Sequence, residues 1–453
     1  MRKSNVSSVS ALKWLSKILE ERFGHTFNLS VKIPNTLLIS LYQYPSIIQL
    51  PFDFDTFTRA DSNMPCTHWD ASAEGWQSVL VSPLPAPGVA SLPSQLITST
   101  DHGMNVAYDI MGLTYWMLSR QEEVGRTDID EHGRFPATSS HAHKHGYLER
   151  PVVDEWIHIL GQVMQRTWPG IKLKENSFCM KVSHDVDQPS LYAFKSPAQI
   201  ARMMGGHLLK RRDPKAFLLA PCIKLTSSRQ ISPADPFNTF EWIMDQSENY
   251  SLTSAFYFIC GHGDPHDADY ELDDSRIRHL MRRIHERGHE IGLHPSYGSY
   301  QSSSMIDQEA KLLLRICAEE GIHQSDWGGR MHYLRWEQPS TLQALSDAGM
   351  SYDSTLSYAD RPGFRCGTCF DYPAFDPIKQ LTLNMRIRPL VMMECSVIDD
   401  AYLGLGKGQA ALDKALSLKN TCAKVGGVFT LLWHNSNLVS AADKNLYQSL
   451  LAQ

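Results

Sequence analysis

The chain has 453 residues, of which 42% are hydrophobic and 20% are charged, and its formal net charge at pH 7 is −6. This is the composition of an ordinary globular protein that is long enough for two domains. The negative charge gives no reason to expect nucleic acid or an anionic membrane as a partner.

Three features of the chain bear on its location. No window approaches eighteen uninterrupted apolar residues, so no transmembrane segment is expected. The residues that follow Met1 are mixed and polar, and they lack the apolar core of a signal peptide. Nine cysteines, an odd number, are scattered over both halves, which suits reduced and buried thiols. We therefore expect a cytoplasmic protein.

The first part of the chain mixes helix-like and strand-like segments. Residues 11–19 have the pattern of an amphipathic helix, residues 36–41 and 46–50 that of short strands, and residues 108–123 that of a strong helix. The pattern of the sequence changes near residue 172. We expect a separate α+β domain over residues 1–170, whose role these residues do not indicate.

The second part of the chain repeats a strand that ends in polar residues. The apolar run that begins at Phe178 ends in His184, Asp185 and Asp187, and the two aspartates, two positions apart, would point to one face of a strand. Farther along, apolar residues at helical spacing over 277–284 precede a glycine and a short strand that ends in His294. This order predicts an α/β barrel over residues 171–453, with these side chains at the rim formed by the carboxyl ends of the strands.

Five segments resemble, in the same order, the motifs of the polysaccharide deacetylase family (carbohydrate esterase family 4, or NodB-like domains). Ser183-His184-Asp185-Val186-Asp187 resembles the first motif, and residues 288–294 resemble the lead into the second. The others are an apolar strand at 254–259, the segment 329–333 at the place of an Arg-Pro-Pro motif, and a strand at 431–435 that contains His434. The N-terminal part resembles an uncharacterised domain that precedes deacetylase-like domains in some bacterial proteins. The resemblance implies an incomplete (β/α) barrel, or NodB-like fold.

The resemblance also implies a divalent metal ion, with Zn²⁺ expected. The family's second motif has a further histidine four positions after His294, where this chain has Gly298. A catalytic zinc normally takes three protein ligands and leaves one position for water. Asp187, His294 and His332 meet that count, and His184 is an alternative to His332.

Hydrolysis of an amide needs a base for the water proton and an acid for the departing amine. Asp185 is the expected base, held ready by Arg330, although Asp187 is an alternative. His434 is the expected acid, because imidazole titrates near neutral pH. Further side chains are expected to bind the sugar through a guanidinium fork or a ring face: Arg335, Tyr297 and Tyr333.

Together these features predict a metal-dependent hydrolase that removes an N-acyl group, with acetyl expected, from a sugar in surface-polysaccharide biosynthesis. Because no signal peptide is seen, the expected substrate is a precursor such as a nucleotide- or lipid-linked sugar. Two alternatives stay open. One is a degenerate barrel that binds glycan without hydrolysing it, which Gly298 favours, and the other is a deformylase or other amidohydrolase acting on a sugar.

Overall fold

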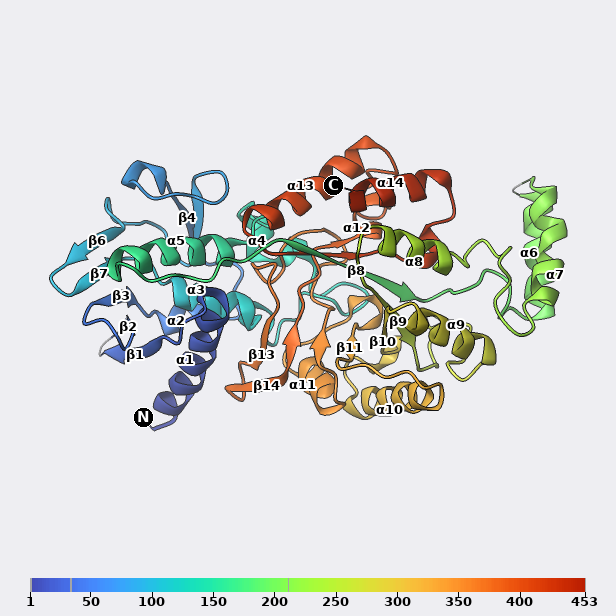
Figure 1. Cartoon of the computed structure of the whole chain (residues 1–453), viewed down its shortest axis with the longest axis horizontal. Helices are drawn as coiled ribbons and strands as arrows, with labels where there is room; N and C mark the ends of the chain where they lie inside the picture. The colour runs from blue at the N-terminus through green and yellow to red at the C-terminus, as the bar shows by residue number, and fades with distance from the viewer. Residues whose placement is uncertain (1, 33–34, 211, 453) are drawn as a thin grey trace.

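The computed structural model of the chain describes residues 2–32, 35–210 and 212–452. An N-terminal α+β part lies at one end of an elongated molecule, a curled sheet with its helices lies in the middle, and a helical hairpin stands at the other end (Figure 1). The predicted opening helix is present as α1 (Arg2–Phe23), and the two predicted strands are present as β2 (Thr36–Ser40) and β3 (Ile47–Pro51). The helix predicted over 108–123 is shorter, since α3 spans Ile110–Leu118.

A five-stranded sheet organises the N-terminal part, in the order β1-β2-β3-β7-β6. Burial alternates along β2 and β3, as it does when one face of a sheet is covered and the other meets water. Helix α3 is buried along its whole length, and α5 packs on α3 and on strands of the sheet. The remaining elements here are β1 (Asn28–Lys32), α2 (Phe54–Phe57), β4 (Cys66–Trp69), β5 (Leu84–Pro87), β6 (Ile97–Thr100), β7 (Gly103–Val106), α4 (His141–Lys144) and α5 (Val152–Thr167).

A nine-stranded sheet forms the middle of the molecule, in the order β13-β14-β12-β11-β10-β9-β8-β16-β15. All neighbours pair in parallel except β13 and β14, and no pairing among the described residues joins the edge strands β13 and β15. The sheet is therefore a curled, incomplete barrel. Its strands are β8 (Cys179–Val186), β9 (Ser254–Ile259), β10 (Glu290–His294), β11 (Gly328–Gly329), β12 (Tyr352–Asp353), β13 (Tyr372–Asp376), β14 (Leu381–Ile387), β15 (Met392–Met393) and β16 (Val428–Leu432).

Helices lie around the outside of this sheet (Figure 1). They are α8 (Phe240–Asn249), α9 (Ser275–Glu286), α10 (Ser303–Glu319), α11 (Ser340–Asp347), α12 (Glu394–Ile398), α13 (Gln409–Lys424) and α14 (Ala441–Ala452). Helix α9 buries Ile277, Leu280, Met281 and Ile284, the apolar series that predicted it. The hairpin at the end of the molecule is α6 (Pro197–Leu209) and α7 (Pro214–Thr226).

Two tyrosine rings fill the inside of the barrel because glycines make room for them. Tyr257 on β9 lies opposite Gly292 on β10, and a Cβ atom at position 292 would lie 2.4 Å from the Tyr257 ring. Gly328 on β11 makes the same space for Tyr352, whose ring would lie 2.1 Å from a Cβ there. The two hydroxyl groups are hydrogen-bonded at 3.1 Å, and the Arg330 guanidinium lies 4.7 Å from the centre of the Tyr257 ring. This layer is the floor beneath the rim.

The N-terminal part and the barrel share one hydrophobic core, and polar contacts cross the junction between them. The Trp14 indole of α1 donates a hydrogen bond to the Pro373 carbonyl at 2.9 Å. Arg22 forms a buried ion pair with Asp154 of α5, and the same carboxylate accepts a hydrogen bond of 2.6 Å from Thr368. Independent folding of residues 1–170 stays a prediction.

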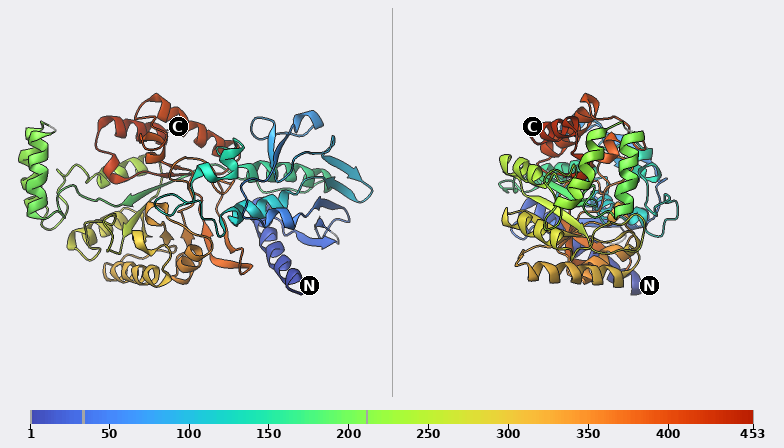
Figure 2. Two further views of the ribbon diagram at one scale, coloured as in Figure 1. Left: turned by 180° about the vertical axis from the view of Figure 1, so that it is seen from behind. Right: turned by 90° about the vertical axis from the view of Figure 1, so that its right-hand side faces the viewer.

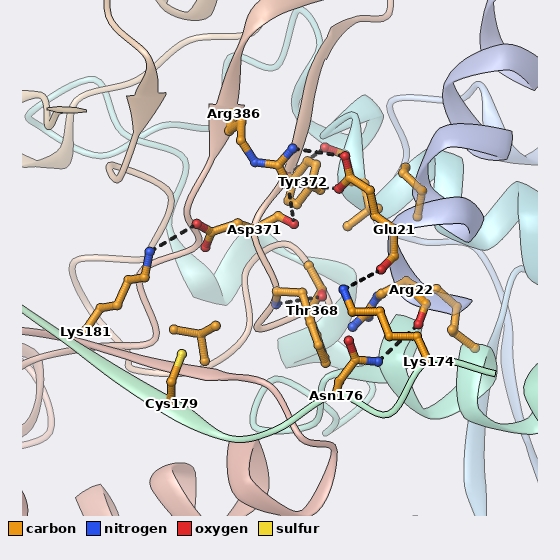
Figure 3. A pocket seen from close by; sticks show the side chains of 15 residues that line it. Glu21, Arg22, Lys174, Asn176, Cys179, Lys181, Thr368, Asp371, Tyr372 and Arg386 are labelled. Carbon is orange, nitrogen blue, oxygen red and sulfur yellow. Dashed lines mark hydrogen bonds and ion pairs between the residues drawn. The ribbon is translucent and has the colours of Figure 1, made fainter. Parts of the chain in front are cut away.

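A cavity of about 450 Å³ lies at this junction, and polar side chains that line it pair with one another (Figure 3). Lys181 lies 3.5 Å from Asp371, and Arg386 lies 2.9 Å from Glu21. The Lys174 amine donates to the Glu21 carbonyl at 3.1 Å. Because these charges already have partners, we assign the cavity a structural role.

Gly292→Ala tests the packing of the floor. The added methyl group must displace the Tyr257 ring, so we expect destabilisation of about 1–3 kcal/mol, as for other overpacked cores. Gly205→Ala is the matched control, since a Cβ there meets nothing within 4 Å and alanine favours a helix. Denaturant unfolding of both variants measures the effect, and equal stabilities of the two would contradict this packing.

Candidate metal centre

The end of β8 sets the site through the alternation of side chains on a strand. Asp185 points to the inside of the barrel, where its carboxylate meets Arg330, and Ser183 does the same. His184 points the other way and stacks on Phe256 with ring centres 5.0 Å apart. The two aspartates thus lie inside the barrel at its carboxyl-end rim.

Three of the predicted ligands come together here. Asp187, His294 and His332 each offer one ligand atom, and the three atoms lie within 4.8 Å of one another. Asp187 Oδ1 lies 3.3 Å from His294 Nε2, and Asp187 Oδ2 lies 3.8 Å from His332 Nε2. His294 is the last residue of β10, and Asp187 and His332 lie in the segments that follow β8 and β11, so the register of these parallel strands positions the group.

Partners behind the two imidazoles orient them. His294 Nδ1 lies 2.5 Å from the Arg330 carbonyl, which only accepts, so Nδ1 carries the proton and the Nε2 lone pair faces Asp187. His332 Nδ1 lies 3.5 Å from Asp267 Oδ1, and the Tyr297 amide holds that carboxylate at 2.7 Å. Such outer partners are typical of metal-binding histidines.

The unpaired atoms of this group suit a cation. Asp187 Oδ1 and His294 Nε2 are buried and have no hydrogen-bond partner among the described residues. Each buried polar atom without a partner destabilises the folded state by about 1–3 kcal/mol, so a bound ligand at these atoms would be stabilising. One carboxylate oxygen and two imidazole nitrogens form a donor set that zinc and similar divalent ions take.

The electrostatics of the group point the same way. Burial alone raises the pKa of Asp187, but the charge of His332 and the other imidazoles around the carboxylate outweigh burial and hold this pKa well below its usual range. Burial lowers the pKa of His332, whereas Asp187 and Asp267 bring it up to about 9. The Asp187 charge therefore needs a positive partner, which is either a proton on His332 or a bound cation.

Asp185 lies beside the three ligands with a partner of its own. Its Oδ1 accepts a hydrogen bond of 2.9 Å from Arg330 Nη1, and its Oδ2 lies 3.7 Å from His294 Nε2. Arg330 is fixed in turn, because its Nε and Nη2 donate to the carbonyl and hydroxyl of Ser354, both at 2.9 Å. The carboxylate is therefore held still in the barrel.

His434 completes the group from the other side. Its Nε2 lies 3.6 Å from Asp187 Oδ2, and its Nδ1 is hydrogen-bonded to Glu394 Oε1 at 2.6 Å. Burial lowers the pKa of His434, but Glu394 raises it well above the usual value. Glu394, Cys395 and His434 also lie close enough to hold a metal, but the hydrogen bond to Glu394 already uses the Nδ1 atom.

A cavity of about 260 Å³ opens over these residues. Its walls mix polar groups with apolar and aromatic ones: Arg134, Asp185, Asp187, Gln188, His294, His332, Tyr333, Leu334, Met393, Cys395, Asp399, Tyr402, His434, Ser436 and Asn437. Arg134 comes from the N-terminal part, so residues far apart in the chain line one cavity.

The segment that carries Arg134 is held against the barrel at both ends. At its start, the buried Glu123 pairs with Arg120 at 2.8 Å and with Arg365 at 2.5 Å. At its end, Arg134 Nε donates to Asp130 at 2.7 Å and Nη1 donates to the Tyr333 carbonyl at 3.1 Å. No hydrogen bond from Arg134 Nη2 is found within the described ranges.

Three predicted residues lie elsewhere than expected. His184, the alternative ligand, packs in the core, where burial lowers its pKa to about 4 and its Nδ1 bonds the Trp433 carbonyl at 2.6 Å. Tyr297 and Arg335 lie beside the cavity but do not line it. The Arg335 guanidinium lies 3.9 Å from the centres of the Tyr297 and Tyr300 rings, and it donates to the His132 carbonyl at 2.7 Å. Of the three predicted sugar-binding residues, Tyr333 lines the cavity.

Glu394, Asp267 and Arg134 were missed by sequence reasoning. Glu394 follows a short apolar run at 390–393, but the strand there has only two residues, so the pattern is weaker than the one before Asp187. Asp267 lies in a polar loop and Arg134 in a segment before the predicted boundary, and nothing local marks either residue.

The family that matches the chain covers its N-terminal part. Residues 14–169 match a family of unknown function, DUF7033. The search of curated proteins gives no match. A solved structure described as a polysaccharide deacetylase from Mycobacterium smegmatis is 17% identical with a TM-score of 0.38, over 63% of this chain and 85% of that one.

Two further solved structures are similar over the same share of this chain. Puue allantoinase is 12% identical with a TM-score of 0.36, over 85% of its own chain. A protein described as a polysaccharide deacetylase from Pseudomonas aeruginosa PAO1 is 14% identical with a TM-score of 0.35, over 86% of its chain. At these levels of similarity we take the function from the geometry of the site.

Proposed function

We propose that the chain is a metal-dependent hydrolase that removes an N-acyl group from a sugar. The observation that carries this proposal is the arrangement around one cavity. The Asp187, His294 and His332 group lies between a carboxylate fixed by an arginine, Asp185, and an imidazole fixed by a carboxylate, His434. Amide hydrolysis needs a base and an acid on separate sides of the reacting carbon, and this arrangement supplies both.

Asp187, His294 and His332 would hold the ion, with Zn²⁺ the expected one from the donor atoms. A divalent ion bound there would supply Lewis-acid chemistry, because it would polarise the amide carbonyl and make a water molecule more acidic.

Asp185 acts as the base in this proposal. Asp185 lines the cavity, its Oδ2 lies 3.7 Å from His294 Nε2 and its Oδ1 is tied to Arg330, so one oxygen is left to take the proton of the attacking water. Because two hydrogen bonds to Ser354 fix Arg330, the Asp185 carboxylate stays in place during the reaction. Asp187 is the less suitable base because three imidazoles surround its carboxylate.

His434 acts as the acid. Glu394 raises the pKa of His434, so the imidazole keeps a proton on Nε2 that it can give to the departing nitrogen. Glu394 also accepts hydrogen bonds from the His434 amide at 2.8 Å and from Asn437 at 2.9 Å, which fixes the ring. When the C–N bond breaks, the nitrogen takes this proton and leaves as an amine.

The cavity walls suit a sugar with a small acyl group. Tyr333, Leu334, Met393 and Tyr402 offer apolar and aromatic faces, and Arg134 offers N–H donors. Acetyl is the expected acyl group, and formyl is the alternative. Gly298 favours a barrel that binds glycan without catalysis only if the metal lacks a third protein ligand. In this proposal His332 is that third ligand.

Asp185→Asn and His294→Ala are expected to fail in different ways. The asparagine cannot take a proton, so we expect kcat to fall by about 10²- to 10⁴-fold while the metal stays bound. The alanine removes a ligand, so metal and activity are lost together. Acetate and formate release from a panel of N-acyl sugars, nucleotide-linked and free, would be measured with the metal content of each variant. Glycan binding by both variants without acid release from the wild type would favour the non-catalytic alternative.

Arg134→Gln tests the contribution of the N-terminal part to the cavity. Losing a charged donor costs about 1.5–3 kcal/mol, so we expect kcat/KM to fall by about ten- to a hundredfold, chiefly through KM. Arg126→Gln is the matched control, since Arg126 lies on the same segment and pairs with Asp128 outside the cavity. Equal kcat/KM values for both variants, with wild-type melting temperatures, would show that Arg134 does not bind the substrate.

A further inference from the structure

The helical hairpin of α6 and α7 stands clear of the rest of the molecule (Figure 2). It has a small core of its own, made by Tyr192, Ile200, Ala220 and Ile223, which is separate from the main core. Its base is rigid, because the buried Asp235 accepts hydrogen bonds from Ser190 at 2.5 Å and from the Leu191 amide at 2.8 Å. The hairpin is thus an ordered projection on a fixed base.

Leucine side chains cover the outside of this projection. Leu209 is 81% exposed, Leu225 77% and Leu218 64%, and Leu208 and Leu219 are each 48% exposed. Of the six exposed leucines among the described residues, only Leu381 lies elsewhere. Five exposed leucines on two short helices are far more than single exposed apolar residues elsewhere on the surface, and such a concentration marks a surface that something covers.

The segment that carries these leucines is also rich in positive charge. Residues 197–226 contain six Lys and Arg residues and a single acidic residue, Asp213, in a chain whose net charge is −6. No ion pair of Arg202, Lys210, Arg212 or Lys215 is found in the part of the chain that the structure describes. The hairpin therefore carries several basic side chains that are free to pair with anions from outside the protein.

We propose that the hairpin docks the protein on the surface of an anionic lipid bilayer. Exposed leucines on a segment with unpaired Lys and Arg residues fit the boundary between lipid acyl chains and anionic headgroups. The whole-chain charge gave no reason to expect such a partner, because its average hides this local concentration. No described helix is long and apolar enough to cross a membrane, so the hairpin would lie at the interface.

The position of the hairpin links this surface to the candidate site. The hairpin is inserted directly after β8, whose arrow points toward it in Figure 1. Asn435, the neighbour of His434, donates to the carbonyls of Gln188 and Phe237 at the two ends of the insertion, at 2.9 and 2.8 Å. The hairpin therefore rises from the rim that carries the cavity. On a bilayer this rim would lie near a sugar carried by a lipid, an extension that rests on the proposed function.

Co-sedimentation of the full chain with phosphatidylcholine vesicles, with and without phosphatidylglycerol, tests the docking itself. We expect binding that requires phosphatidylglycerol and weakens with added salt. Lys210→Gln with Lys215→Gln should lower the partition coefficient by about fivefold for each charge removed. Leu209→Ser with Leu218→Ser should lower it by at least about tenfold.

The controls separate docking from general stickiness and from misfolding. Val81→Ser and Ile378→Ser change exposed apolar residues outside the hairpin and should leave the partition coefficient unchanged. All variants should keep the wild-type circular dichroism spectrum. Equal binding to both kinds of vesicle, no binding to either, or hairpin variants that bind like the wild type would overturn the proposal. So would a dimer in sedimentation equilibrium that the leucine substitutions abolish, because a second copy would then cover the leucines. Amide hydrolysis on soluble substrates is measured separately, so failure of docking and failure of the proposed function are distinguishable.

Discussion

The charge of Asp187 is the constraint on which the candidate site depends. Three imidazole Nε2 atoms, those of His294, His332 and His434, lie between 3.3 and 3.8 Å from its oxygens. Each imidazole has a different partner behind it, which is the Arg330 carbonyl, Asp267 or Glu394. A half-buried carboxylate whose Oδ1 atom is shielded from water needs compensating positive charge. The rings are therefore held in one orientation, and the lone pair of His294 faces the carboxylate without a hydrogen-bond partner among the described residues.

The barrel beneath the site makes this arrangement rigid. Glycines at 292 and 328 let two tyrosines fill the interior, and Arg330 lies above one of them while it holds Asp185. The N-terminal part adds a wall from outside, because buried ion pairs of Glu123 fix the segment that ends in Arg134. The site is thus assembled from the strand ends of one unit and a segment of the other.

Much of this could be predicted from local sequence, because strand alternation and strand ends are local properties. The alternation along β8 predicts that Asp185 and Asp187 share a face, and β10 predicts a rim position for His294. Glu394 follows a strand of only two residues, which gives little pattern to detect. Arg134 reaches the cavity through contacts between distant segments, which periodicity cannot show. The basic run at 210–212 resembles a solvated helix end until the neighbouring leucines are seen to be exposed.

The position of the metal ion tests the central claim most directly. Crystals of the protein grown with zinc, measured at the zinc absorption edge, should give one anomalous peak about 2.0–2.2 Å from an Asp187 oxygen and from the Nε2 atoms of His294 and His332. A peak at Glu394, Cys395 and His434 instead, or no peak in the barrel at saturating zinc, would contradict the account.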